Sequence, residues 1–154
     1  MYPFDWVEDA LKSHLTNNYH EMQDAMAWKN LTCEPKGHKV WLKIINTPSV
    51  EEGITLGLTG DNEMRGFLQI AIYTELNIGM EPTKEVLGRV GKIFDIPQRL
   101  PAPEACMLRL LRKTFSQGGQ TSVADFTRGG KEGYWDAQYV TIYWLAREPK
   151  QRTI

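Results

Sequence analysis

Between residues 39 and 79 the sequence alternates apolar and polar side chains, and this pattern constrains the fold more than any other stretch of the chain. Apolar residues stand at every second position in a first and in a last segment (Val40, Leu42, Ile44; Leu68, Ile70, Ile72). Such alternation is typical of half-buried antiparallel strands. The segment between them, which contains Ile54–Gly57, is predicted to be a further strand. The stretch therefore predicts a meander of three strands.

The breaks between these strands are predicted from their turn-forming residues. Pro48 and Gly53 separate the first two strands, and residues 59–62 separate the second from the third. Both breaks are expected to be hairpin connections. Residues 61–65 would then form an exposed hairpin tip, where charge changes alter stability by less than about 0.5 kcal/mol.

Two helices are predicted from apolar stripes at three- and four-residue spacing. The first covers residues 3–17, and the second begins at Pro82 and ends near Phe94. Residues 19–28 between the first helix and the strands are read as a loop with room for one helical turn.

The C-terminal part of the chain is predicted to hold two more strands. Residues 105–115 fit a helix as well as a strand, but their position before a final strand, residues 134–146, favours the extended form. Pro97, Pro101 and Pro103 predict an irregular connection ahead of them. Residues 116–131 are rich in Gly, Gln, Ser and Thr and predict a long flexible loop. Residues 147–154 predict a mobile tail.

These elements predict one α+β domain over residues 1–154. The expected order is α-β-β-β-α-β-β, with a mixed or antiparallel sheet of about five strands and both helices on one face. The other face must then meet solvent, loops or another subunit.

Composition argues against several classes of function. The formal net charge is −1, and Lys and Arg are spread along the chain, so no specific binding of nucleic acid is expected. The apolar runs are shorter than the roughly 20 residues of a membrane span, and the N-terminus lacks the pattern of a secretion signal. We therefore expect no membrane partner.

Reactive motifs of the common enzyme classes do not occur in the sequence, so we expect no catalytic activity, no cofactor and no metal. A zinc site from three histidines and Cys33 is the alternative, but its ligands are scattered over a helix, a loop and a strand. His14 is better explained as a packed residue at the edge of its helix. Cys33 and Cys106 are expected to be reduced thiols rather than a disulfide.

Three further patterns have a functional and a structural explanation. Asp61, Asn62 and Glu63 offer oxygen ligands for calcium, but they also suit a turn. Residues 118–122 resemble a phosphate cradle but lack its lysine, which favours a flexible loop. Aromatic residues between 134 and 144 offer a stacking platform for single-stranded nucleic acid, but core and interface packing explain them better.

The pattern of the whole stretch resembles the tail terminator-like family of long-tailed bacteriophages. The resemblance rests on Ile54–Gly57, on Arg65–Tyr73, and on the Ile78-Gly79 exit before a helix. Residues 27–30 upstream and residues 133–135 downstream agree with it, so it spans roughly residues 27–144. These motifs are packing and turn patterns without a reactive group.

The resemblance implies a structural protein of the virion, made in the host cytoplasm and placed at the head–tail junction. It would form a hexameric ring that caps the tail tube, stops tube polymerisation and presents a surface for head attachment. Its partners would be further copies of itself, the tail tube protein and a head-completion or connector protein. The candidate assembly contacts lie at the expected hairpin tip and in the expected loop: Asp61, Asn62, Glu63, Arg65, Gln117, Gln120, Asp125, Arg128 and Lys131.

Two other functions stay open at this point. A head-completion or neck protein is the rival within the structural class. A small enzyme or ligand-binding domain that uses Cys33 or a histidine is the rival from another class.

Overall fold

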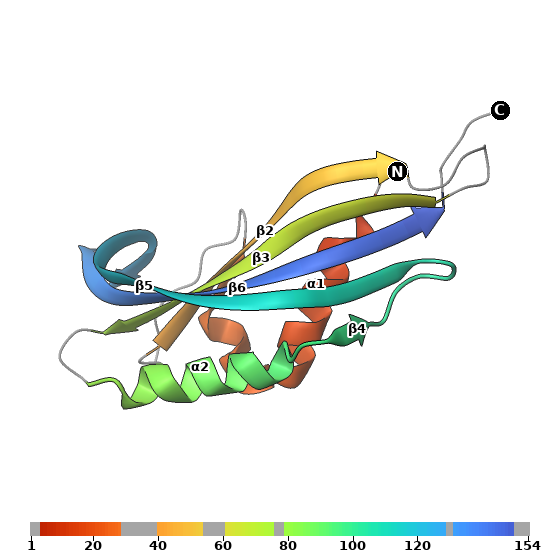
Figure 1. Cartoon of the computed structure of the whole chain (residues 1–154). Helices are drawn as coiled ribbons and strands as arrows, with labels where there is room; N and C mark the ends of the chain where they lie inside the picture. The colour runs from red at the N-terminus through yellow and green to blue at the C-terminus, as the bar shows by residue number, and fades with distance from the viewer. Residues whose placement is uncertain (1–3, 29–39, 54–60, 76–78, 129–130, 150–154) are drawn as a thin grey trace.

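The computed structural model describes residues 4–28, 40–53, 61–75, 79–128 and 131–149; at 50–53, 118–128 and 131–134 it describes the backbone alone. Helices and strands follow one another along the chain as Figure 1 shows. Their bounds are α1 Trp6–Asn18, the 3-10 helix η1 His20–Ala25, β1 Met26–Trp28, β2 Val40–Gly53, β3 Asp61–Glu75, α2 Glu81–Ile93, β4 Gln98–Leu100, β5 Met107–Arg128 and β6 Lys131–Pro149.

Six strands form one mixed sheet in the order β1-β2-β3-β6-β5-β4. β1 runs parallel to β2, and the other neighbours are antiparallel. β3 and β6 lie at the centre and pair over their whole common length, from Asp61 opposite Pro149 to Glu75 opposite Trp135. Both α1 and α2 lie on the same side of this sheet (Figure 1). The predicted α+β class and the placement of the two helices on one face are confirmed.

Each helix forms where the sequence places one apolar residue per turn toward the sheet. α1 buries Val7, Leu11 and Leu15, and it ends where the Tyr19 amide donates a hydrogen bond of 2.9 Å to the Leu15 carbonyl. α2 has Pro82 in its first turn, where the missing amide hydrogen costs nothing. Both predicted helices are confirmed, and η1 supplies the single helical turn expected before the strands.

The N-terminal strands differ from the predicted meander in three ways. β2 continues through Pro48 to Gly53, because a bulge between Pro48 and Val50 absorbs the proline without ending the pairing. β2 therefore pairs directly with β3, and the predicted strand at 54–57 lies outside the described residues. β1 was not predicted, since three residues are too short to show alternation.

Residues 61–65 do not form a hairpin tip, so this prediction was wrong. They open β3, with β2 on one side and β6 on the other. The turn-forming character of Asp61 and Asn62 was outweighed by pairing on both sides. The expectation that their charges matter little for stability loses its basis.

The C-terminal part also contains more strand than predicted. β5 and β6 together cover most of residues 116–131, so the loop expected there is instead the distal part of a hairpin. Bulges after Gln117 and Ser122 accommodate the glycines and small polar residues that suggested a loop. β6 likewise includes residues 147–149 of the predicted tail; residues 150–154 lie outside the described part. The irregular connection at 97–103 holds the short strand β4.

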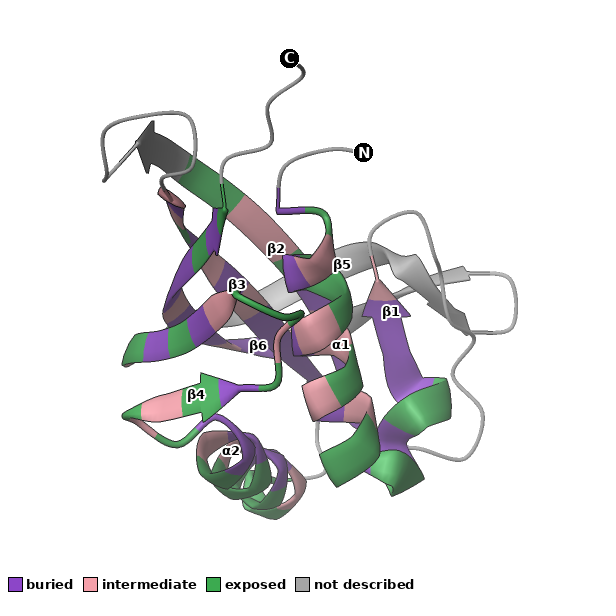
Figure 2. Cartoon of the chain, turned by 90° about the vertical axis from the view of Figure 1, so that its right-hand side faces the viewer, coloured by how far each residue is buried: buried purple, intermediate pink, exposed green. Residues whose placement is uncertain are grey.

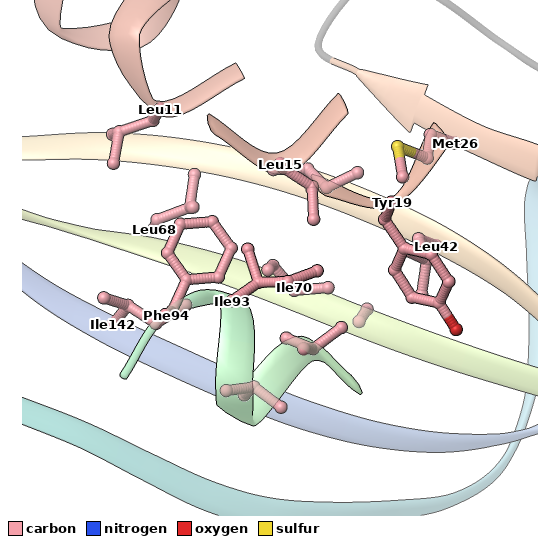
Figure 3. Packing of buried hydrophobic residues seen from close by; sticks show 14 of the residues in the cluster. Leu11, Leu15, Tyr19, Met26, Leu42, Leu68, Ile70, Ile93, Phe94 and Ile142 are labelled. Atoms are coloured by element: carbon pink, nitrogen blue, oxygen red, sulfur yellow. The ribbon is translucent and has the colours of Figure 1, made fainter. Parts of the chain in front are cut away.

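The main core lies between the helices and the inner face of the sheet. Figure 2 shows that the buried residues of α1 and α2 face the sheet while exposed residues cover their outer sides. In Figure 3 the side chains of α1 and α2 meet those of β2, β3 and β6. The labelled members of this cluster that are fully buried are Leu11, Leu15, Leu42, Leu68, Ile70, Phe94 and Ile142.

Trp144 on β6 crosses the backbone of β3 at Gly66, its partner in the ladder. A Cβ atom on Gly66 would lie 2.5 Å from Cζ2 of Trp144 and 2.6 Å from the Thr47 carbonyl oxygen. The indole Nε1 donates a hydrogen bond of 2.8 Å to Oδ1 of Asn46 on β2. One side chain thus fixes three neighbouring strands in register.

Glu148 near the end of β6 anchors the start of α1. Its carboxylate accepts hydrogen bonds from the Phe4 amide at 3.0 and 3.1 Å and from Trp6 Nε1 at 2.8 Å. The residue is buried, so these donors replace the water it loses. This contact explains why the chain stays in a strand where a mobile tail was predicted.

We expect Gly66→Ala to destabilise the fold by about 1 to 3 kcal/mol, because the methyl group meets a packed indole and a carbonyl oxygen. Chemical denaturation checks this. Gly88→Ala is the control: a Cβ atom at this position of α2 would have nothing within 4 Å, so the change should stabilise by about 0.5 to 1 kcal/mol. Equal stability of the two variants would refute the crossing contact.

We expect Glu148→Ala to cost about 1 to 3 kcal/mol, because the buried Phe4 amide and the partly buried Trp6 indole N–H lose their acceptor. Urea denaturation measures the loss, and hydrogen exchange should show faster exchange at the start of α1. Unchanged exchange there would contradict the proposed anchoring.

Candidate functional site on the outer face of the sheet

The outer face of the sheet, opposite the helices, carries the side chains that alternate with the core positions. Antiparallel partners point to the same side, so the ladder gives its rows directly. One row runs from Thr47 through Phe67 and Tyr143 to Arg112. The next runs from Arg65 through Leu145 and Arg109 to Arg99. Arg65, Arg99, Arg109 and Arg112 in these two rows are exposed.

A hollow of about 470 Å³ lies over these rows. Its lining comes from four strand segments that are distant in the sequence: Ser49, Arg65, Gly66, Phe67, Leu111, Arg112, Tyr143 and Trp144. Leu111 is the extra residue of a bulge in β5 and is 37% exposed. The bulge therefore places an apolar side chain in solvent at the edge of the hollow, a position that a regular strand would not supply.

Aromatic rings form the apolar part of the hollow. Phe67 and Tyr143 lie side by side with 6.1 Å between ring centroids. The Arg112 guanidinium lies 4.3 Å from the centroid of the Tyr143 ring, a cation–π distance. This stacking holds the guanidinium over the aromatic pair while leaving its N–H groups available.

Glu63 joins two arginines at one end of the face. Its Oε1 lies 3.2 Å from Nε of Arg65, and its Oε2 lies 3.3 Å from Nε of Arg147. The carboxylate is 8% exposed, whereas the two arginine side chains are 62% and 46% exposed. The buried carboxylate of Glu63 thus holds in place two guanidinium groups that face solvent.

Arg99 and Arg109 are directly opposite each other on β4 and β5. Both are exposed, and neither has an ion-pair partner among the described residues. Like charges across a ladder repel, so this pair costs some stability. A binding partner that brings carboxylates would remove that cost.

The far end of the outer face is closed. Trp41 on β2 and Trp135 on β6 pack in a T-shaped pair with 6.3 Å between centroids, and both are nearly inaccessible. The hollow and the arginines lie toward the opposite end of the face, where exposed side chains are accessible to a partner.

The predicted contact residues separate into two groups. Glu63 and Arg65 belong to the outer face, and Asp61 and Asn62 open β3 beside them. Gln117 is exposed in β5, whereas Gln120, Asp125 and Arg128 lie farther along β5 and Lys131 begins β6. The structure does not bring the two groups together. Their role in assembly stays a prediction.

Sequence reasoning missed Phe67, Leu111 and Arg112, whereas Tyr143 belonged to the aromatic residues at 134–144 for which core or interface packing was predicted. Of these aromatic residues, Tyr139 and Tyr143 lie on the outer side of β6 and are half-buried. That pattern was a usable indication of an interface. Leu111 and Arg112 had no comparable pattern, because the bulge shifts which residues face outward.

The rival enzyme would need a reactive cysteine or histidine. Cys106 is a free thiol, and burial, with smaller contributions from Glu148 and Asp61, raises its pKa. A raised pKa makes a thiol a poorer nucleophile at neutral pH. His14 packs edge-on against Phe94 at 5.3 Å and contacts the Ile93 carbonyl through Nε2, which confirms it as a packed residue. Cys33 and His38 lie outside the described residues.

No cluster of three or more His, Cys, Asp or Glu side chains that suits a metal occurs in the described part of the chain. No helix among the same residues is long and apolar enough to span a membrane.

Comparison with known proteins gives a family match and a fold match. The family model described as "Phage tail terminator protein" matches residues 6–141. A solved structure without a functional name superposes with a TM-score of 0.53 at 16% sequence identity, over 96% of this chain and 98% of that one. At this identity the likeness concerns the fold. No curated protein sequence matches the chain.

We expect Glu63→Gln to lower stability by up to about 1 kcal/mol, because two arginines lose the carboxylate that pairs with them while their exposed guanidinium groups stay hydrated. Thermal and urea denaturation measure the change. Glu104→Gln, at an exposed turn position, is the matched control and should shift stability by less than about 0.5 kcal/mol. Equal effects of the two changes would show that Glu63 does not organise this face.

Proposed function

The chain belongs to the phage tail terminator family, and from this we propose that it assembles into a hexameric ring that caps the tail tube, stops its polymerisation and offers a surface for head attachment. The family is a structural one, and the chain has a structural role in a phage tail. The ring, its position at the head–tail junction and its two partners, the tube protein and a head-completion protein, belong to the proposal.

One observation supports assembly most directly: the outer face of the sheet is uncovered where it is aromatic and basic. Phe67, Tyr143 and Leu111 surround a hollow whose rim carries Arg65 and Arg112. Aromatic and arginine side chains are enriched at protein interfaces and dominate their binding energy. A tail protein that presents such a face is suited to bind another protein there.

A closed ring requires two different surfaces on each subunit, one that meets the preceding copy and one that meets the next. The outer face is our candidate for one of them. For axial contacts with the tube and the head we keep the distal β5–β6 hairpin, which carries Gln117, Gln120, Asp125, Arg128 and Lys131. Figure 1 shows this hairpin curling at one end of the sheet, away from β4. We also propose that this hairpin is flexible in the free protein and becomes ordered when it contacts the tube or the head.

No step of this function requires a reactive group. The protein would act by occupying the tube end and by excluding the next layer of tube subunits. The raised pKa of the Cys106 thiol fits that role better than it fits a nucleophile.

We predict that the purified protein, added to polymerising tail tubes, shortens them to a uniform length and is found at one end. Electron microscopy with labelled protein measures both effects. Leu111→Asp should abolish or strongly reduce capping, because it places a charge at the apolar edge of the hollow. Met80→Asp is the control: Met80 is 41% exposed on the helical side and should cap like the wild type.

Two outcomes would contradict the proposal. If tubes grow past the bound protein, it is not a terminator. If it binds isolated heads but leaves tube length unchanged, the head-completion function is the correct one.

A further inference from the structure

We propose that the outer face of the sheet receives the acidic N-terminal end of α1 from a second copy of the chain. The inference rests on the proposed ring, and it names the two surfaces that meet between neighbouring subunits. It follows from how the described charges are divided between the two layers of the domain.

The sheet layer of the domain is basic on its outer face. Arg65, Arg99, Arg109 and Arg112 are exposed on the outer face. Arg65 and Arg112 line the hollow, whereas Arg99 and Arg109 line a separate one with Pro97 and Gln98. Glu63, the acidic residue among them, is buried and already holds Arg65 and Arg147. Of the other acids in the rows of this face, Asp61 and Glu75 lie at the two ends of β3, and Glu52 stands opposite Glu63 in the ladder. The acids thus lie on β2 and β3, and the β4–β5 part of the face, which carries Arg99, Arg109 and Arg112, presents positive charge to a partner.

The helical side carries the matching negative charge. Asp5, Glu8 and Asp9 are exposed at the start of α1, and none of them pairs with a cation among the described residues. Glu8 and Asp9 also interact favourably with the helix dipole, but that interaction leaves their carboxylates in solvent. The link between Phe4 and Glu148 places this end of α1 over the end of β6 that carries Arg147. The two patches thus lie at the same end of the domain on opposite faces.

Charge then determines which surfaces can meet. Two outer faces brought together would oppose arginine to arginine, which disfavours a symmetric pair. An outer face on the start of α1 opposes four arginines to three carboxylates. That contact is heterologous, the kind that propagates from subunit to subunit and closes a ring when the rotation allows it. The whole chain has a formal net charge of only −1, so separated charges attract without strong overall repulsion between copies.

The apolar hollow fits the centre of such a contact. Stable interfaces combine an apolar, aromatic centre with a charged rim, and here Phe67, Tyr143 and Leu111 would be the centre with Arg65 and Arg112 at the rim. Arg112 is held in place by its stacking on Tyr143, so less side-chain freedom is lost on binding.

A reciprocal charge reversal tests the pairing in the full-length protein. Arg112→Glu and Glu8→Lys should each weaken self-association at least about tenfold in Kd, measured by sedimentation equilibrium in the free protein and by ring formation on tail tubes. An equimolar mixture of the two variants should recover association. When the two variants alternate along the assembly, the outer face of each subunit again meets an α1 start of opposite charge. Raising the salt concentration should weaken the wild-type contact.

Matched controls carry the same charge changes on α2. Lys84→Glu and Glu85→Lys, both exposed, should associate like the wild type. All four variants should stay folded: Glu8→Lys loses a helix-dipole interaction of about 0.3 to 1 kcal/mol and Arg112→Glu loses its stacking on Tyr143, so both should melt only slightly below the wild type. The melting temperature of each variant separates lost association from lost folding.

The outcomes distinguish this inference from the proposed function. If the wild type caps tubes and both reversed variants form rings equally well, the pairing is wrong while the function stands. If neither variant self-associates and their mixture does not associate either, the outer face binds a different partner and the pairing is again overturned. If the mixture recovers association but no protein caps tubes, the pairing stands and the terminator function fails.

Discussion

The crossing of Trp144 over Gly66 is the contact on which the arrangement of the sheet depends. The indole lies against a backbone without a Cβ atom, and its Nε1 reaches Asn46 on the next strand. A slip of one residue in the β3–β6 ladder would turn every side chain of a strand to the opposite face. By fixing β2, β3 and β6 together, this contact determines which residues meet the helices and which remain on the outer side.

The division into two faces explains how a protein without reactive motifs has a usable surface. Inward positions in the middle of the central strands, such as Leu68, Ile70 and Ile142, are aliphatic and pack in one core with residues of α1 and α2, which stabilises the domain. Outward positions at the open end combine aromatic rings with arginines. Glu63 lies between these two tasks, since it is buried within the sheet yet orients Arg65 and Arg147 toward solvent. Folding and presentation of the surface are thereby coupled through one carboxylate.

The sequence allowed the class of fold to be predicted because alternation and helical spacing are local properties. Both helices and the inward residues of β2, β3 and β6 could be identified in this way. Features that depend on distant partners could not. Pro48 and the glycines near 118 suggested breaks, but bulges keep those strands paired. Asp61 and Asn62 looked like a turn because the strands on both sides of β3 could not be foreseen. The outward position of Leu111 arises from a bulge, so the hollow could not be read from the sequence.

A reconstruction of terminated tail tubes by electron cryomicroscopy tests the central claim most directly, because it shows the protein at the place where it is proposed to act. The proposal predicts a closed ring of six copies on the tube end, with the outer sheet face of each copy covered by the start of α1 of its neighbour. Copies that bind singly, or a ring in which Phe67, Tyr143 and Arg112 face open solvent, would contradict it.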